Sequence, residues 1–361
     1  MKIAIIGAGP VGCYTGYLLA KQGYSVKIYE NHSSVGSPIQ CTGLLTKDFD
    51  KLGLSKKDFL VNTFEKVTVY SPNGKVTIPQ KEYLVCRTKF DKYFAKLALN
   101  NGVVIKVNHT FIGRSGKTLR IKNALQNKII EVTPDIVIGA DGPLSPVAKA
   151  FSFYHPKRKN YFGIQALVKG KFDPKFFSAY FSKDICSDLF AWIVPESIST
   201  ARVGLAMYKD SKKYFDKFMA ENGFKSKEIQ GGTIPLYCPQ QKLQKDNCYL
   251  VGDAATFVKA TTLGGLIPGL WQARVLADCI KYGKDYQKSC RPLARRLHLH
   301  LWIKRIFDNF SDKDWNKLVK YVSQPRVQKS FKKYTRDNPL PLVISVLLRE
   351  PRLLWFGRRL F

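Results

Sequence analysis

The first 30 residues carry the pattern that most constrains how this chain can fold. A strand-like apolar run leads into a turn with three glycines, and a helix-compatible stretch and a second strand-like run follow. In chain order these pieces are Ile3-Ala4-Ile5-Ile6, Gly7-Ala8-Gly9-Pro10-Val11-Gly12, Cys13 to Gln22, and Ser25 to Tyr29. Gly7 and Gly9 permit a tight turn and close approach of the backbone to a pyrophosphate, while Gly12 lets the helix pack on the strand. The pattern predicts a dinucleotide-binding strand–helix–strand unit.

Glu30 closes the second strand and bears on which dinucleotide the unit takes. A pyrophosphate is expected at the helix N-terminus, where unpaired N–H groups and the helix dipole favour negative charge. A carboxylate about 20 residues beyond the glycines can accept both hydroxyls of an adenosine ribose, and it would repel a 2′-phosphate. FAD and NAD are therefore the candidates.

Length and composition indicate a globular protein of about two domains. The chain has 361 residues, of which 45% are hydrophobic. The start, Met1 to Ile6, is too short for a signal peptide and runs straight into the glycine turn, so we expect a buried strand. No run approaches the roughly 18 apolar residues that a membrane-spanning helix needs.

The eight cysteines give no sign of a metal site. They include no C-x-x-C pair and no zinc or iron–sulfur spacing. His298 and His300 are neighbours in sequence, but two residues apart they do not share a helix face. We predict no metal, and scattered reduced thiols are typical of a cytoplasmic protein.

The charge of the chain is strongly positive, with 59 basic and 27 acidic side chains and a net charge of +32. An anionic membrane surface, an acidic protein such as a ferredoxin, or nucleic acid would each suit it. A lysine-rich organism whose proteins are all basic is a further explanation. No nucleic-acid-binding module accompanies the charge, so we do not expect nucleic acid as a partner.

The C-terminus combines apolar and basic residues. The stretch 340–348 is apolar, and the stretch 349–361 interleaves aromatic residues with arginines. The segment could lie in a membrane interface with Trp355 and Phe356 immersed. It could equally form a helix packed on the body of the protein.

Between these ends, alternating apolar residues predict an antiparallel sheet. The expected strands are Tyr161 to Lys169, Ala179 to Phe181, Leu189 to Val194 and Ala201 to Met207, with a hairpin over residues 64–79. Helices are expected over 90–101, 211–222 and 266–280. No second glycine-rich unit for a nicotinamide nucleotide is visible, so stable NAD binding beside the first nucleotide is not expected.

Two later glycine-centred segments resemble flavin-contact segments of FAD-dependent oxidoreductases. They are Ile138-Gly139-Ala140-Asp141-Gly142, followed by Pro143 and Ser145, and Val251-Gly252-Asp253-Ala254-Ala255. The resemblance implies FAD, with Asp141 and Gly142 in the Asp-Gly motif and Asp253 on the ribityl chain. Asp-Gly is also a common turn dipeptide. Gly264 and Gly265 are expected to border the isoalloxazine ring, although a flexible loop with a helix cap would look the same.

Three further stretches resemble the geranylgeranyl reductase family, including the archaeal enzymes that saturate digeranylgeranylglycerophospholipids. They are Gly36 to Leu45, Cys86 to Asp91, and Leu189 to Pro195 with Ala201 to Leu205. The Y-x-W-x-F-P pattern of the family matches Trp192 and Pro195. The chain has Phe190 for its tyrosine and Val194 for its phenylalanine, so a hydroxyl is lost.

The resemblance implies roles for several residues. Phe190 and Trp192, with Pro195 in the same motif, would line an isoprenoid channel, although one strand face of any sheet packs such residues in a core. Cys41 would lie near the flavin and is our candidate proton donor, with a structural thiol as the alternative. Arg87 would approach FAD, or it could pair with Asp91 four residues on.

The expected fold class is α/β, a Rossmann-like FAD-binding domain interrupted by an antiparallel-sheet substrate domain, with a helical C-terminal segment. This architecture resembles the aromatic hydroxylases. We place the FAD domain at 1–63, 84–160 and 246–290, the substrate domain at 64–83 and 161–245, and the helical segment at 291–361.

The family implies an FAD-dependent reductase that hydrogenates carbon–carbon double bonds of geranylgeranyl chains. Electrons would come from an external donor, either an acidic ferredoxin or a reduced nicotinamide. Alternatives are a flavin monooxygenase of the aromatic-hydroxylase type and a non-enzymatic, basic protein that binds membrane or nucleic acid through a vestigial nucleotide fold. We expect a cytoplasmic protein, peripheral on the inner face of the cell membrane.

Overall fold

A six-stranded sheet carries the glycine segments. The computed structural model describes residues 1–226 and 228–360. Strand order is β16-β17-β10-β1-β2-β6, and every neighbouring pair is parallel except β16 with β17. The strands are β1 (Lys2–Ile6), β2 (Ser25–Tyr29), β6 (Val104–Lys106), β10 (Ile136–Gly139), β16 (Gln244–Lys245) and β17 (Cys248–Leu250). The carboxyl ends of parallel strands share one edge, so β17, β10, β1 and β2 bring the segments that follow them together there.

Helices pack against this sheet and bury its apolar side chains. They are α1 (Pro10–Ala20), α2 (Arg87–Leu99), α5 (Leu266–Tyr282) and the short α3 (Pro146–Ala150) and α6 (Tyr286–Ser289). Helix α1 packs against both α2 and α5. The strand β1 is buried from Ile3 to Ile6, as a strand covered on both faces must be. The predicted strand over Ser25 to Tyr29 is confirmed.

An eight-stranded sheet forms the second layer, in the order β15-β11-β14-β13-β12-β4-β5-β3. Its strands are β3 (Leu44–Thr46), β4 (Leu60–Ser71), β5 (Gly74–Val85), β11 (Asn160–Lys169), β12 (Phe176–Tyr180), β13 (Ala191–Pro195), β14 (Thr200–Met207) and β15 (Ile229–Pro235). All neighbours are antiparallel except β12 and β4, which run parallel. The expected hairpin is β4–β5, and α4 (Ser211–Glu221) packs on β11 and β14. The predicted antiparallel sheet is therefore confirmed.

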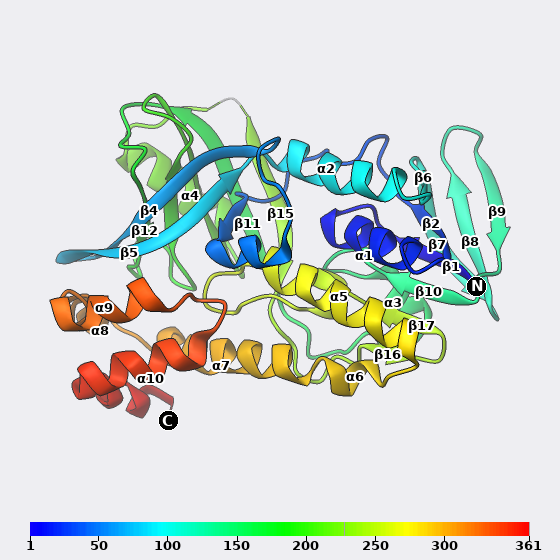
Figure 1. Ribbon diagram of the computed structural model, residues 1–361. Helices are drawn as coiled ribbons and strands as arrows, with labels where there is room; N and C mark the ends of the chain where they lie inside the picture. The colour runs from blue at the N-terminus through cyan, green and yellow to red at the C-terminus, as the bar shows by residue number, and fades with distance from the viewer. Residues whose placement is uncertain (227, 361) are drawn as a thin grey trace.

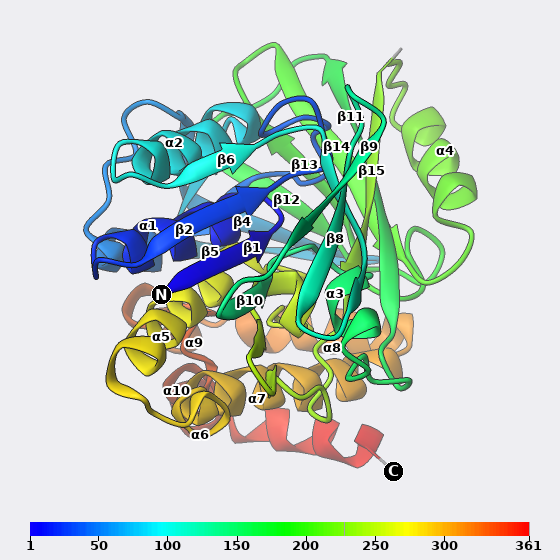
Figure 2. The same ribbon diagram turned by 90° about the vertical axis from the view of Figure 1, so that its right-hand side faces the viewer.

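A small three-stranded sheet, which we did not predict from the sequence, lies beside the first. It consists of β7 (His109–Ser115), β8 (Thr118–Asn123) and β9 (Lys128–Val132). Figure 1 shows it at the end of the molecule opposite the eight-stranded sheet, and in Figure 2 it faces the viewer. There are also two short 3-10 helices: η1 (Lys47–Leu52) contacts β3 and β5 of the eight-stranded sheet, and η2 (Gly252–Ala255) contacts α5.

The C-terminal region is helical, and both views place it beneath the two sheets (Figures 1 and 2). It consists of α7 (Arg291–Asp308), α8 (Asp312–Val322), α9 (Pro325–Lys333), α10 (Pro339–Arg349) and the 3-10 helix η3 (Pro351–Leu360). Phe356 is buried, with its ring centroid 4.8 Å from that of Phe310, so η3 packs on the other helices of this region, α7, α8 and α10. Among the described helices, none is long and apolar enough to cross a membrane.

These layers confirm the expected fold class, a Rossmann-like α/β domain with an antiparallel substrate sheet and a helical C-terminal region. Strand β12 begins three residues before the predicted start at Ala179, and β13 begins two residues after the predicted start at Leu189. The domain bounds proposed from sequence stay a prediction.

Candidate functional site

One cavity of about 540 Å³ lies where the two sheets meet. The glycine turn after β1 lines it, as do the Asp-Gly segment after β10, the start of η2 and the N-terminus of α5. On the opposite side it is lined by the eight-stranded sheet. Segments more than 200 residues apart thus share one space, as the strand order requires.

The glycines of the turn have distinct roles. A Cβ on Gly7 would lie 2.3 Å from the carbonyl oxygen of Ala140, and its φ of +103° is rare for other residues. A Cβ on Gly12 would lie 2.2 Å from the carbonyl oxygen of Gly7. A Cβ on Gly9, by contrast, would meet nothing within 4 Å. Gly7 and Gly12 are needed for packing. Gly9 has no side chain to cover the backbone, which therefore stays accessible from the cavity beside Pro10.

Glu30 is buried at the cavity wall, and its carboxylate fixes the turn. Its Oε2 accepts a hydrogen bond from the amide of Ala8 at 2.7 Å. Its Oε1 accepts from the amide of His32 at 3.0 Å and lies 2.5 Å from His32 Nδ1. Each carboxylate oxygen has two lone pairs, so acceptor capacity remains for a ribose.

Asp141 acts first on its own loop. Its Oδ1 accepts from the Ser145 hydroxyl at 2.8 Å, and its Oδ2 accepts from the Val147 amide at 2.8 Å, which caps α3. Burial raises the pKa of Asp141 to about 6, although these hydrogen bonds oppose the rise. Gly142 has a φ of +78° and borders the cavity. The segment is therefore a preformed turn whose backbone faces the cavity.

Asp253 presents an acidic side chain at the cavity wall. Among the described residues no hydrogen bond ends on its carboxylate, which adjoins Gly265 so closely that a Cβ there would lie 2.7 Å from Oδ1. Burial raises the pKa of Asp253 to about 6, against the opposing effect of Arg87 and Arg158. Gly252, with a φ of +67°, sets the turn that positions it. A carboxylate placed like this can accept from ligand hydroxyls.

Arg158 was missed by the sequence analysis. Its guanidinium donates to the carbonyl oxygens of Pro143 at 2.5 Å, Ala254 at 3.0 Å and Asp253 at 3.3 Å. It lies over the ring of Tyr154, 4.3 Å from the centroid. Arg158 therefore ties the Asp-Gly segment to η2, although no motif in the sequence marks it.

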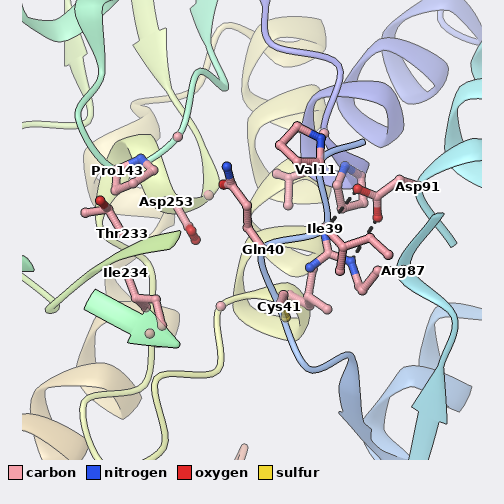
Figure 3. Close-up of a pocket in the computed structure, with 18 of the residues that line it drawn as sticks. Val11, Ile39, Gln40, Cys41, Arg87, Asp91, Pro143, Thr233, Ile234 and Asp253 are labelled. Carbon is pink, nitrogen blue, oxygen red and sulfur yellow. Dashed lines mark hydrogen bonds and ion pairs between the residues drawn. The ribbon is translucent and has the colours of Figure 1, made fainter. Parts of the chain in front are cut away.

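Arg87 and Cys41 lie together on the other side of the cavity. Figure 3 shows Arg87, Asp91 and Cys41 on one side, Pro143 and Asp253 on the other, and Gln40 between them. Arg87 Nε and Nη2 each donate to Asp91 at 3.0 Å. The Arg87–Asp91 ion pair considered in the sequence analysis therefore exists, but it is largely buried in the cavity wall. Cys41 is half-buried, and its Sγ accepts from the Gly43 amide at 3.4 Å.

Gly264 and Gly265 lie at the start of α5, and both border the cavity. The main chain bends back so that the Lys259 amide donates to the Gly264 carbonyl at 3.3 Å. The hydroxyl of Thr262, in the same loop, is buried and has no partner among the described residues. The helix N-terminus supplies N–H groups that favour an anion.

The substrate side of the cavity is mainly apolar. Phe190 and Trp192 both line it, with ring centroids 6.2 Å apart. On β12, Phe177 and Ala179 extend the same wall. Pro195 ends β13 away from the cavity lining, with its carbonyl accepting from Asn62. Phe190 and Trp192 are therefore brought together at the site and Pro195 is not.

The donor set fits a dinucleotide of the FAD type. The carboxylate after β2 would suit the adenosine ribose, the bare glycine turn the pyrophosphate, and the Asp253 carboxylate, which has no partner among the described residues, the ribityl chain; all three line one cavity. The helix N-terminus at Gly265 would suit the charge that gathers on a reduced isoalloxazine ring. In the part of the chain that the structure describes, no group of three or more metal-ligating side chains occurs.

Comparison with known proteins adds independent information. Residues 5–42 match the NAD(P)-binding Rossmann-like domain family. The chain is 25% identical to a digeranylgeranylglycerophospholipid reductase from Methanocaldococcus jannaschii, over 99% of this chain and 97% of that protein. It is 27% identical to the protein of the same name from Thermoplasma volcanium, over 89% of this chain and 91% of that one.

A solved structure has the same fold throughout. It is a geranylgeranyl bacteriochlorophyll reductase-like protein from Thermoplasma acidophilum, which aligns with a TM-score of 0.85 and 21% identity over 100% of this chain and 99% of that chain.

Proposed function

We propose, from the premise that this chain belongs to the geranylgeranyl reductase family of FAD-dependent oxidoreductases, that it hydrogenates carbon–carbon double bonds of geranylgeranyl chains. Relatives named for digeranylgeranylglycerophospholipid reduction match nearly the full length of the chain, which supports a membrane lipid or its precursor as the substrate. The cofactor we propose is FAD.

One observation carries this proposal. The nucleotide segments and the aromatic face of the eight-stranded sheet line the same cavity, so a flavin and an apolar chain could occupy it side by side. Each CH₂ buried there is worth about 0.8 kcal/mol, which favours a long hydrocarbon over a small polar substrate. Phe190 and Trp192 supply that apolar wall.

The chain must orient the alkene and keep water away from it. Reduced FAD, when bound, would supply a hydride, which an isolated alkene accepts only when it is positioned closely and protected from solvent. Phe190, Trp192 and Phe177 form the surface that can do both. Cys41 is our candidate to hold the proton for the second carbon, since it lines the cavity beside Arg87.

The experiment is an anaerobic assay of holoenzyme reduced with dithionite and supplied with a geranylgeranyl lipid. We expect products heavier by two hydrogens for each double bond reduced, detected by mass spectrometry. Unchanged lipid, with intact FAD and a folded protein, would contradict the proposal.

A flavin monooxygenase is the second candidate, because monooxygenases share the three flavin segments. A p-nitrophenol 4-monooxygenase from Pseudomonas putida aligns with a TM-score of 0.65 and 15% identity, over 99% of this chain and 98% of that chain, which shows a common fold only. Oxygen consumption driven by NAD(P)H and dependent on an aromatic substrate would favour it. The match of this chain to reductases favours an anaerobic reaction instead.

The electron donor we propose is external, either an acidic ferredoxin or a reduced nicotinamide. The net charge of +32 supports an acidic protein partner because opposite charge speeds encounter. Stopped-flow reduction of the bound FAD by each donor would separate the two. A rate for ferredoxin that falls steeply with salt supports the protein donor.

The helix α10 supports a peripheral position on an anionic membrane. Leu340, Ile344 and Leu348 lie four residues apart on one face and are 56%, 49% and 77% exposed. The helix packs on α7, α9 and η3, and Leu354 on η3 is 63% exposed. Arginines at 349, 352, 358 and 359 follow this stripe in the sequence, and Arg352 and Arg359 pair with Glu350 and Asp314. An interfacial helix combines these features, with apolar residues immersed and cations on head groups.

Vesicle flotation tests this surface. We expect wild-type protein to float with vesicles that contain anionic lipid and to bind neutral vesicles weakly. A triple variant with glutamate at 340, 344 and 348 should lose about tenfold in binding. The control is Leu125→Glu, since Leu125 is 79% exposed in a turn of the small sheet. Equal binding by both variants would contradict an α10 interface.

A further inference from the structure

On the cavity wall away from the nucleotide segments, the described residues include one charged side chain, that of Arg336. The ionisable residues on the nucleotide side are Glu30, His32, Arg87, Asp91, His109, Asp141 and Asp253. The sheet side is lined by apolar and neutral polar side chains, such as Phe177, Trp192 and Gln165. Arg336, from the loop between α9 and α10, also lines the cavity. A guanidinium beside an apolar trough needs an explanation, because hydrocarbon gives it no hydrogen bond.

The guanidinium of Arg336 is held but not saturated. Its Nη2 donates to Glu82 Oε2 at 2.6 Å, and Glu82 is fully buried on β5. Its Nε is buried with no partner among the described residues. The side chain keeps 21% of its surface exposed, so part of the fork remains available to a ligand. Glu82 lies opposite Thr46 in the pairing of β5 with β3, the strand whose Leu44 lines the cavity.

The backbone on both sides of Arg336 is clamped. Asp337 Oδ1 accepts from Lys259 Nζ at 2.5 Å, in a pair whose side chains are 4% and 6% exposed, and Asp337 also accepts from the Thr46 hydroxyl. His300 Nε2 lies 2.8 Å from the Arg336 carbonyl oxygen. Burial lowers the pKa of His300 to about 4, so the ring is neutral at pH 7 and donates through Nε2. Arg336 is therefore preorganised.

The local charges balance without a ligand. Arg336 pairs with Glu82 and Lys259 pairs with Asp337, while His300 is neutral. Burial raises the pKa of Glu82, although Arg336 and Lys259 oppose the rise. If Glu82 took up a proton, Arg336 would lose its ion-pair partner and its guanidinium could bind an incoming anion. Phosphate suits a guanidinium because two of its oxygens match the fork.

We infer that Arg336 binds a phosphoryl head group of the isoprenoid substrate, a role that rests on the function proposed above. The hydrocarbon then runs from Arg336 along the aromatic wall toward the glycine segments. Arg336 precedes α10 by three residues, so the head group lies on the side of the molecule where Leu340 begins the exposed apolar stripe. A lipid entering from a membrane surface would keep its polar end on that side.

Binding to oxidised holoenzyme tests this inference without turnover. Calorimetry would compare geranylgeranyl phosphate, geranylgeraniol and a dispersed digeranylgeranyl phospholipid. Wild type should bind an anionic ligand about tenfold or more tightly than the alcohol. Arg336→Gln should remove that preference and leave the affinity for geranylgeraniol and the FAD content unchanged, and Arg336→Lys should retain part of it. The control is Arg326→Gln, which removes an exposed arginine paired with Glu350.

Two results would overturn the inference. One is an Arg336→Gln variant that keeps the preference for phosphate, and the other is equal loss of phosphate and alcohol binding. If that variant does not fold, Glu82→Gln provides the test instead. This substitution frees the Arg336 guanidinium, so phosphate binding should become tighter. Unchanged phosphate binding would overturn the proposed role of Arg336. Arg336-dependent binding of either anionic ligand supports the inference. Tighter binding of the phospholipid would identify a lipid head group, and tighter binding of geranylgeranyl phosphate would identify an isoprenyl phosphate. Wild type that binds but never reduces the lipid would overturn only the proposed reaction.

Discussion

Single residues at this site trade stability for binding, and Asp253 is the clearest case. Its carboxylate is partly buried at the cavity wall and receives no hydrogen bond from the described residues. A carboxylate without donors costs folding free energy when it is ionised. A ligand that donates hydroxyls to it would recover that cost, which is how a binding residue differs from a structural one.

Asp253→Asn should therefore stabilise the flavin-free protein at neutral pH. The folded pKa of about 6 lies above the unfolded value near 3.8, so the contribution of Asp253 to stability is full below about pH 4 and is lost as pH rises through 6. The variant should match wild type at low pH and exceed it above pH 6 by about 1–3 kcal/mol. Denaturant unfolding between about pH 3.5 and 8 checks this. A difference that does not change with pH would contradict it.

Arg158 is predicted to act as a positioning residue for the flavin segments. Arg158→Met removes donors from the carbonyls of Pro143, Asp253 and Ala254, so the two segments should separate. We expect FAD affinity to fall about tenfold or more, with loss of about 1–3 kcal/mol of stability.

Fluorescence titration of flavin-free protein with FAD measures this loss of affinity. Arg114→Met is the matched control, because Arg114 also donates to main-chain carbonyls but lies outside the cavity. Equal FAD affinity in the two variants would contradict the role of Arg158.

At the scale of elements, different glycines of the β1–α1 turn serve packing and cofactor binding. A Cβ on Gly12 would meet the Gly7 carbonyl oxygen at 2.2 Å, whereas Gly9 faces open space. Gly9→Ala should leave stability within about 0.5 kcal/mol of wild type, since its φ of −63° suits alanine, yet weaken FAD binding about tenfold or more. Gly12→Ala should cost about 1–3 kcal/mol by overpacking. Thermal unfolding and FAD titration on both variants check the contrast; a destabilised Gly9→Ala would contradict it.

Elements with local signals could be predicted from the sequence. The glycine spacing and apolar runs predicted β1, α1 and β2, and alternation predicted the antiparallel sheet, in which β13 bears Trp192 and begins one residue after Phe190. The small sheet over residues 109–132 was missed because two of its strands, β7 and β8, contain few apolar residues.

Partners distant in sequence left no such signal. Arg336 and Glu82 are 254 residues apart, and Lys259 and Asp337 are 78 apart, so only the folded chain brings them together. The role of Arg158 likewise depends on two segments that meet through strand order rather than through any local pattern.

At the scale of the whole molecule, three layers meet at one cavity. The Rossmann-like sheet presents its glycine segments, the eight-stranded sheet presents an aromatic wall, and the C-terminal region contributes Arg336. Helix α10, whose exposed leucines and isoleucine form the apolar stripe, belongs to the same C-terminal region, and Figures 1 and 2 show where this helix lies. The arrangement suits an enzyme that draws a lipid chain from a surface toward a flavin.

The most direct test of this account is an anaerobic single-turnover experiment on the dithionite-reduced holoenzyme, freed of excess reductant. Absorbance of oxidised FAD and the mass of a geranylgeranyl lipid would be followed together after mixing. The account predicts that oxidised FAD reappears at the same rate as lipid that is heavier by two hydrogens, in equal amounts. FAD that stays reduced with the lipid present, and is oxidised only when oxygen is admitted, would contradict it.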